Sequence, residues 1–155
     1  MHVERLYLSP ERGSAQRPCR QLSLLAGQGV AGDRHCGRSD WPGQNLTLIE
    51  AEEIEEFCNV TGRPVDLSLS RRNIVTRGIR LNELVGKRFY IGECELLGVE
   101  LCEPCRTLGQ RLENASLSGP EVVRYWLGRG GLRADVLRGC KLIVGDALRL
   151  PESLT

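Results

Sequence analysis

Short apolar runs separated by glycines extend over most of the chain and predict a fold built mainly of β-strands. Val, Ile and Leu are frequent in these runs, and many of the 18 glycines stand between them. The predicted strands cover residues 3–8, 21–25, 45–49, 73–76, 88–91, 94–101, 132–138, 141–144 and 147–150. Many short strands joined by tight turns favour a mainly β fold, with barrel-like, mixed and mostly antiparallel strands.

Apolar positions three to four residues apart mark the segments that we expect to be helical. In residues 50–58 the apolar side chains share one face, and glutamates occupy the rest. Residues 120–127 begin with a proline, which suits a first helical turn, and are followed by Gly128. A third candidate covers residues 106–114. We expect these few helices to lie at the periphery of the sheet.

Two glycine–acid pairs, Gly92-Glu93 and Gly145-Asp146, each follow a predicted strand. We predict a hairpin at both, because glycine permits a tight turn between antiparallel strands. No linker or low-complexity segment divides the 155 residues, and this length is typical of one domain. The sequence therefore predicts a single domain over residues 1–155.

The balance of charges narrows the classes of partner. Lys and Arg number 21 against 20 Asp and Glu, so the net charge of +1 gives no general attraction to nucleic acid or to a membrane surface. No apolar run approaches the roughly 18 residues that a membrane span needs. The N-terminus lacks the features of a secretory signal, so we expect a cytoplasmic protein without nucleic-acid or membrane partners. Any anionic ligand must be held by a local cluster of cations.

The seven cysteines are an odd number and are scattered among apolar segments. This distribution argues against a framework of disulfides. We expect most of the cysteines, including Cys58 and Cys140, to be small buried residues of the core. The remaining question is which cysteine is reactive.

Cys105 is the predicted reactive cysteine. It follows Pro104 where a strand gives way to the start of a helix, and Arg106 adds a positive charge beside it. Unpaired backbone N–H groups and a neighbouring cation both favour a thiolate. The alternative is that Cys105 is an inert residue of the turn.

Cys102 and Cys105 also form a Cys-x-x-Cys pair. A thioredoxin-like redox site would place this pair after the first strand of a βαβ unit, whereas here it lies late in a β-rich chain. A zinc site would need His35 and Cys36 as further ligands, but no second pair has metal-ligand spacing. We predict instead that Cys102 is buried at the strand and that Cys105 is exposed beyond it.

Two other clusters have side chains suited to binding or proton transfer. In the glycine-rich segment 29–37, Asp33 and His35 can orient one another; the alternative is that Asp33 caps a turn and His35 is exposed to solvent. Arg71 and Asn73, with an arginine between them, stand at a strand entrance. Guanidinium groups bind oxyanions in a planar, bidentate manner, so this pattern predicts a phosphate site or else an ordinary solvated charge pair.

Three further arginines complete the set of candidates. Arg133 opens a strand and either points into the same site or covers apolar surface with its stem. We expect Arg77 and Arg80 to be surface residues.

The order of these clusters along residues 20–150 resembles that of the MOSC domain family. The matching elements are Gly32-Asp33-Arg34-His35, Gln44 through Glu52, Arg71-Arg72-Asn73, Pro104-Cys105, Gly131 through Val136, and Gly145-Asp146. Members of this family have a β-barrel-like core and occur alone in bacteria or at the C-terminus of molybdenum cofactor sulfurases.

The resemblance implies a function for Cys105. In the family, the cysteine of the Pro-Cys element carries sulfur as a persulfide or binds the molybdenum cofactor (molybdopterin) as a metal ligand. The implied partners are a sulfur donor such as a cysteine desulfurase, and a molybdoenzyme or its cofactor. The implied pocket residues are Asp33, His35, Arg71, Asn73 and Arg133.

The sequence departs from the family pattern at one position and lacks two domains of larger relatives. Cys102 is not expected as a family feature, so a role in resolving a persulfide on Cys105 stays open. The pyridoxal-phosphate desulfurase domain and the N-terminal β-barrel of larger relatives are missing from the sequence, so we expect it to need an external sulfur donor. One alternative function is molybdenum-dependent reduction of N-hydroxylated compounds, which the resemblance also implies. The other is a non-catalytic interaction module with a buried, inert Cys105.

Overall fold

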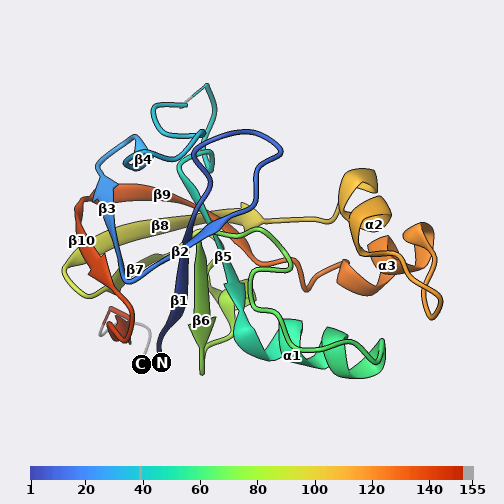
Figure 1. The fold of residues 1–155 in the computed structure, drawn as a ribbon. Helices are drawn as coiled ribbons and strands as arrows, with labels where there is room; N and C mark the ends of the chain where they lie inside the picture. The colour runs from blue at the N-terminus through green and yellow to red at the C-terminus, as the bar shows by residue number, and fades with distance from the viewer. Residues whose placement is uncertain (39, 152–155) are drawn as a thin grey trace.

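The computed structural model describes residues 1–38 and 40–151, and most of its strands form one eight-stranded sheet (Figure 1). These strands are β1 (His2–Leu8), β2 (Arg17–Cys19), β5 (Leu46–Glu50), β6 (Ile74–Arg77), β7 (Arg88–Ile91), β8 (Cys94–Leu101), β9 (Leu132–Arg138) and β11 (Leu148–Arg149). Their order in the sheet is β11-β7-β8-β9-β5-β6-β1-β2. Strand β5 pairs with β6 in parallel and the other neighbours pair antiparallel, which confirms the predicted mixed, mainly β fold.

A smaller sheet of three antiparallel strands packs against the larger one. Its strands, in the order β10-β3-β4, are β10 (Cys140–Ile143), β3 (Gln21–Leu25) and β4 (Gly29–Val30). Alternate side chains of a strand point to the same side, so each sheet contributes one apolar face to a common core. That core includes Leu22 and Leu24 of β3, Leu96 of β8 and Val136 of β9.

The larger sheet curls strongly but does not close, so the predicted barrel is only an approximation. Its edge strands are β11 and β2. The start of β1 reaches the segment before β11, where the Val3 N–H donates to the Asp146 carbonyl at 2.9 Å and an isolated bridge joins His2 to Ala147. These contacts bring the two ends of the sheet together without a continuous ladder of hydrogen bonds.

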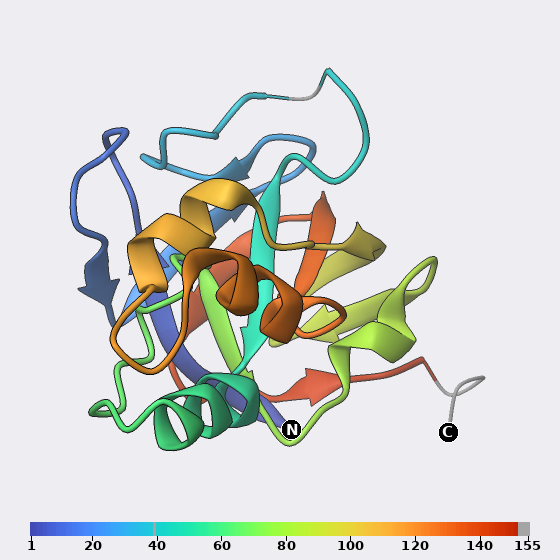
Figure 2. The ribbon, with the colours of Figure 1, turned by 90° about the vertical axis from the view of Figure 1, so that its right-hand side faces the viewer.

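Three α-helices lie on one side of the sheets (Figure 2). They are α1 (Ala51–Val60), α2 (Arg106–Leu112) and α3 (Gly119–Trp126), close to the predicted segments, and a 3-10 turn spans Leu81–Leu84. A second apolar cluster joins them, in which the rings of Phe57 and Trp126 lie 5.1 Å apart. None of the helices in the described part of the chain is long and apolar enough to cross a membrane.

Helices α2 and α3 approach each other most closely at two glycines. A Cβ placed on Gly109 would lie 2.6 Å from the carbonyl oxygen of Gly119, which is closer than real side chains come. Helix α3 begins at a capping box, in which the Ser118 hydroxyl accepts from the Glu121 N–H and the Glu121 carboxylate accepts from the Ser118 N–H. The capping box defines the start of α3, and the glycine contact holds α2, and therefore the residue that precedes it, against this helix.

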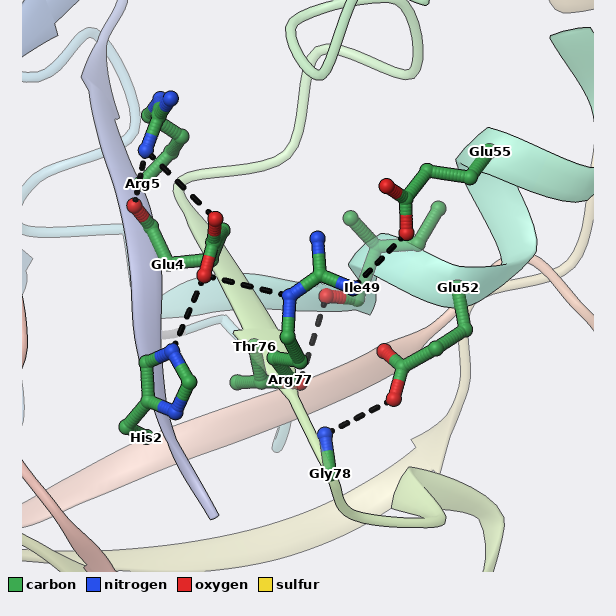
Figure 3. Close-up of polar contacts among 9 residues, drawn as sticks. All are labelled: His2, Glu4, Arg5, Ile49, Glu52, Glu55, Thr76, Arg77 and Gly78. Atoms are coloured by element: carbon green, nitrogen blue, oxygen red, sulfur yellow. Dashed lines mark hydrogen bonds and ion pairs between the residues drawn. The ribbon is translucent and has the colours of Figure 1, made fainter.

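A polar network joins the neighbouring strands β1 and β6 to helix α1 (Figure 3). The Arg77 guanidinium contacts the Glu55 carboxylate at 2.8 Å and the Glu4 carboxylate at 3.2 Å. Arg77 is therefore half-buried between two carboxylates, whereas Arg80 is the exposed surface residue that the sequence predicts. Arg80 also contacts the carboxylate of Glu50, at 3.2 Å.

The two glycine–acid pairs differ in what they join. Gly92, at a φ of 56°, turns the chain between β7 and β8, so this hairpin is confirmed. The hairpin predicted at Gly145-Asp146 is wrong, because β10 pairs with β3 while β11 pairs with β7. This turn instead carries the chain from the small sheet to the large one.

One disulfide connects the two sheets. Cys94 at the start of β8 bonds to Cys140 at the start of β10, with the Cα atoms 5.2 Å apart. The expectation that Cys140 is a free core residue is therefore wrong, whereas Cys58 is free and buried as predicted. The remaining free cysteines are Cys19, Cys36, Cys102 and Cys105.

Candidate functional site

A cavity of about 560 Å³ opens where β8 ends and α2 begins, next to the glycine-rich loop 29–37. The loops and strand ends around it come from parts of the chain that are far apart in sequence. Its wall includes all six residues selected from the sequence, namely Asp33, His35, Arg71, Asn73, Cys105 and Arg133. The structure thus brings the predicted candidates together at one place.

Cys105 stands at the entrance to α2 with its side chain exposed toward the cavity. Its backbone is extended, with φ −119° and ψ 171°, so the sulfur lies beside the first turn of the helix. The backbone N–H of Leu108 is the largest cause of a lowered pKa for the Cys105 thiol, and contacts with Thr107 and the charge of Arg72 add to it, against a smaller opposing effect of burial. The expected contribution of Arg106 is not found, because that exposed side chain does not line the cavity.

Cys102 lies deeper in the same wall. It is 2% exposed, and its N–H donates to the Gly131 carbonyl at 2.7 Å, which holds it at the end of the sheet. The prediction of a buried Cys102 and an exposed Cys105 is confirmed. The described residues contain no group of three His, Cys, Asp or Glu side chains placed to hold a metal ion.

Asp33 fixes the glycine-rich loop to its surroundings. Its Oδ1 accepts from the Ser9 N–H at 2.9 Å and from the Asn73 amide at 3.4 Å, and its Oδ2 accepts from the His35 N–H at 3.2 Å. Burial is the largest single influence and acts to raise the pKa of Asp33, but the hydrogen bonds from His35 and Ser9 outweigh it and lower the pKa. Asp33 is therefore an anion at neutral pH.

The same carboxylate orients the His35 ring. His35 Nδ1 lies 3.5 Å from Asp33 Oδ2, while the ring itself is about half exposed on the cavity wall. An anion beside Nδ1 favours a proton on that nitrogen, which leaves Nε2 as an acceptor in the neutral ring. The pair is suited to receive a proton from a ligand or return it.

Asn73 is buried, and its amide is held by two strands and a loop and does not face the cavity as a free group. Its Oδ1 accepts from the Thr47 N–H at 3.2 Å and the Thr47 hydroxyl at 3.4 Å. Its Nδ2 donates to the Tyr7 carbonyl and to Asp33, each at 3.4 Å. These four contacts use the donors and acceptors of the amide, so Asn73 acts by positioning β1, β5 and the loop that carries Asp33.

Arginine side chains concentrate positive charge on the wall next to Cys105. Arg71 has a φ of 60°, unusual for a residue with a side chain, and its guanidinium donates to the Ser14 carbonyl. Arg72 donates to the Gly130 carbonyl at 3.1 Å. Because both partners are neutral carbonyls, neither contact neutralises a guanidinium charge.

This concentration of positive charge affects the pKa of Arg111 in α2. Burial is the main cause of a lowered pKa for Arg111, and the nearby positive charges of Arg71 and Arg72 lower it further. An anion bound among the three would relieve the repulsion between them. The Ser70 hydroxyl lies on the same wall, is 3% exposed and has no hydrogen-bond partner in the described structure. A polar group of a ligand would provide that partner.

Residues 31–149 match the MOSC domain family. The chain belongs to this family. Solved structures of similar fold include the YuaD protein from Bacillus subtilis, with a TM-score of 0.81 and 21% identity over 95% of this chain and 93% of that one. YiiM from Geobacillus stearothermophilus has a TM-score of 0.76 and 14% identity, covering 97% of this chain and 75% of that one. YiiM from Escherichia coli has a TM-score of 0.65 and 18% identity, covering 98% and 70%. No curated protein matches the chain significantly.

Several side chains around the cavity of this MOSC domain were not selected from the sequence. Arg133 of β9, which was selected, contacts Glu100 at 3.7 Å at the side of the cavity. The additional cavity residues that matter most are Arg34, Arg38, Trp41, Ser70 and Arg111. Arg34 lies within the Gly-Asp-x-His element and Ser70 directly precedes Arg71, so both could have been predicted as cavity residues from their neighbours in sequence. No local pattern marks Arg111 or Trp41.

Proposed function

We propose that this MOSC domain binds a molybdopterin-type cofactor in the cavity, and that Cys105 holds the metal or carries a sulfur atom destined for it. The observation that carries the proposal is a thiol of lowered pKa that shares a cavity with uncompensated arginines. Family membership supports the same conclusion.

The side chains of the cavity fit such a cofactor. Guanidinium groups bind phosphate, and Arg71, Arg72 and Arg111 lie on the same wall as Cys105. The buried Ser70 hydroxyl and Arg34 Nε have no partner in the described structure and can each serve a polar group of the ligand. A thiolate is a suitable ligand for a soft metal centre.

Each residue has a defined task in this proposal. When bound, the cofactor would supply a redox-active molybdenum. The three arginines would hold the phosphate, the Cys105 sulfur would bind the metal, and His35 would hold a proton whose position Asp33 sets. Asn73 keeps Asp33 in place from behind.

Sulfur transfer to Cys105 needs an external persulfide, for which a cysteine desulfurase is the proposed donor. The Cys105 thiolate attacks the outer sulfur of the donor persulfide, forming a new sulfur–sulfur bond at Cys105. The sulfur–sulfur bond of the donor breaks, and the donor cysteine leaves as a thiolate. No net oxidation occurs, and the lowered pKa of Cys105 supplies the attacking thiolate.

A second candidate is reduction of N-hydroxylated compounds by the cofactor-loaded domain. The observation that favours it is the Asp33–His35 pair, which lies on the same cavity wall as Cys105 and can deliver a proton there. The idea of an interaction module with a buried Cys105 is not supported, because Cys105 is exposed. The cytoplasmic location of the protein stays a prediction.

The test is expression in a host that makes the cofactor, followed by measurement of bound molybdenum and of the fluorescent pterin released on oxidation. We expect both in the wild type and a loss of molybdenum in Cys105→Ser. The matched control is Cys36→Ser, a half-buried free cysteine that does not line this cavity.

The persulfide branch is tested separately with a desulfurase and cysteine. Mass mapping should find one added sulfur atom on the peptide of Cys105. A wild-type protein that acquires no molybdenum, no pterin and no added sulfur at Cys105 would contradict the proposal. Cofactor binding without added sulfur favours the reductase candidate, which turnover of a benzamidoxime-type substrate would then test.

A further inference from the structure

The Cys94–Cys140 disulfide, which the proposed chemistry of Cys105 does not use, lies at the far end of β8 from the cavity. Cys94 begins β8 and is fully buried, whereas Cys140 begins β10 and is only partly buried. A reductant can therefore approach the bond from the side of Cys140. Disulfides of cytoplasmic proteins are usually catalytic or redox-sensing, so in the location predicted from the sequence this bond would be transient.

One row of paired residues leads from this disulfide across the small sheet to the loop that carries Asp33. Cys140 of β10 lies opposite Leu24 of β3, and Leu24 in turn lies opposite Val30 of β4. The Val30 carbonyl accepts from the Asp33 N–H at 3.1 Å, and the Asp33 carboxylate accepts from the His35 N–H at 3.2 Å. The three neighbouring strands of the small sheet thus connect the disulfide to the Asp33–His35 pair.

This row is tightly packed where it meets the disulfide. Leu24 is 2% exposed and Val30 is fully buried, and both belong to the core cluster that also contains Cys94. A Cβ placed on Gly139, the residue before Cys140, would lie 2.2 Å from the Leu24 carbonyl oxygen. Because close-packed interiors transmit a displacement, a movement of Cys140 displaces Leu24 and Val30 as well.

Reduction of the bond requires such a movement. Two thiols occupy more space than two bonded sulfur atoms, since non-bonded atoms cannot approach to the length of a disulfide bond. Cys94 is enclosed by the core, so the partly buried Cys140 is the partner that can move outward. Strand β10 is an edge strand of the small sheet and is hydrogen-bonded to β3, so an outward shift of β10 draws β3 and β4 with it.

We propose that the Cys94–Cys140 disulfide is a redox-sensitive control of the loop that carries Asp33 and His35. In the oxidised protein the bond holds the small sheet against β8, and the loop keeps the two side chains on the cavity wall. In the reduced protein β10 shifts outward, and the loop loses its fixed position. The inference concerns the loop itself, so it does not depend on which ligand the cavity binds.

The reductant in this proposal is a dithiol. Its thiolate attacks the Cys140 sulfur, forms a mixed disulfide with Cys140 and releases Cys94 as a thiolate, which takes up a proton. The second thiol of the reductant loses its proton, attacks the reductant's own sulfur in the mixed disulfide and releases Cys140. The reductant thereby becomes a disulfide, and two electrons have passed to the protein.

Hydrogen exchange of the backbone amides, read by mass spectrometry of peptides, compares the oxidised protein with the same protein after reduction by a phosphine. At short labelling times we expect several-fold faster exchange in residues 21–37 and 140–143 of the reduced protein, and unchanged exchange in α1, which lies outside the small sheet. Cys140→Ser should exchange as the reduced protein does under both conditions. The matched control is Cys19→Ser, which removes a free cysteine and should keep the wild-type response.

Unchanged exchange in the loop after complete reduction would overturn the proposal. An equal rise in α1 would also overturn it, because reduction would then loosen the whole fold and not the loop in particular.

The chain has two histidines, so NMR of their rings gives an independent readout. Reduction should shift the ring signals of His35 and leave those of His2, which contacts Glu4 at 2.9 Å at the start of β1. Shifts at neither ring, or equal shifts at both, count against the control of the loop.

Discussion

The buried amide of Asn73 donates to the carboxylate of Asp33 at 3.4 Å, so the residue directly before β6 sets the position of a residue in the cavity wall. The amide makes its other contacts with Thr47 and Tyr7. The network therefore transmits the geometry of the strands to the loop that carries His35. Asn73 therefore contributes to the stability of the fold and positions the site without facing the ligand space itself.

Replacing Asn73 with Ala should lower the free energy of unfolding by about 1–3 kcal/mol, because the Thr47 N–H and the Tyr7 carbonyl lose a buried partner. Urea denaturation measures the change, and Asn59→Ala on the exposed side of α1 is the control. An unchanged stability together with lost anion binding would show that Asn73 contacts the ligand directly.

Cys105 should be the first thiol to react with iodoacetamide near neutral pH, as seen by peptide mapping. Its pKa is lowered, so the thiolate forms at lower pH than for an ordinary cysteine, and removing Arg72 should raise the pKa and shift the rate–pH profile to higher pH. Arg106→Ala is the matched control, because Arg106 adjoins Cys105 in sequence but lies off the cavity wall. Preferential labelling of Cys58 would refute the assignment.

Mild oxidation of the native protein should produce little Cys102–Cys105 disulfide. Cys102 is buried and tied to Gly131, whereas Cys105 is exposed at the start of α2, and bridging them requires the turn at Pro104 to move. Thiol counting with and without denaturant measures the outcome. Rapid loss of two thiols without a change in oligomer size would instead establish a redox pair.

Trp41 should report binding of a planar ligand. It is 63% exposed on the cavity wall, while Trp126, the only other tryptophan, is 1% exposed in the core. The turn that carries Trp41 is anchored, because the Gly43 N–H donates to Asp135 at 2.9 Å and the Gln44 side chain accepts from the Asp40 N–H at 2.8 Å.

Stacking of a heterocycle on Trp41 should quench its fluorescence, and Trp41→Ala should weaken binding of that ligand by about 1–3 kcal/mol. Trp41→Phe, which keeps a ring, should retain most of the affinity but lose the quenching. Quenching that persists in Trp41→Phe would assign the signal to Trp126 and remove the argument for stacking.

Reduction of the Cys94–Cys140 disulfide should lower the free energy of unfolding by about 2–4 kcal/mol, because the bond closes a long loop in the unfolded chain. Denaturation with and without a phosphine reductant measures this difference. Cys140→Ser should show the lower stability in both conditions. Equal stability of the wild type with and without reductant would mean that packing between the sheets suffices.

Local patterns in the sequence predicted most of the fold. Strand β8 alternates buried and less buried positions over much of its length, and its hairpin with β7 turns at a glycine, so period and turn chemistry agreed. The short strands β2 and β4 carried no such period and were missed. The open edge of the sheet was also missed, because closure depends on contacts such as that of Val3 with Asp146, which no local pattern reports.

In the candidate site, too, residues with a local sequence pattern were predicted, and residues placed by distant contacts were not. Cys105 and Asp33 were predictable because proline, glycine and acid residues restrict the local backbone around them. Arg111 and Trp41 were not, because each reaches the cavity only through packing of distant segments. Asn73 was selected as a binding residue, whereas the structure surrounds its amide with protein partners, which favours a supporting role.

The contact of Gly109 with Gly119 gives the site a mechanical dependence on a residue that never meets a ligand. Any side chain at Gly109 must push α2 away from α3, since its Cβ would lie 2.6 Å from a backbone oxygen. Cys105 precedes α2 directly and Arg111 belongs to it, so both would move with the helix, whereas Arg71 and Arg72 lie on another segment of the chain. The distance from the sulfur to these two arginines can therefore be adjusted by the width of a single methyl group, without replacing any polar residue of the cavity.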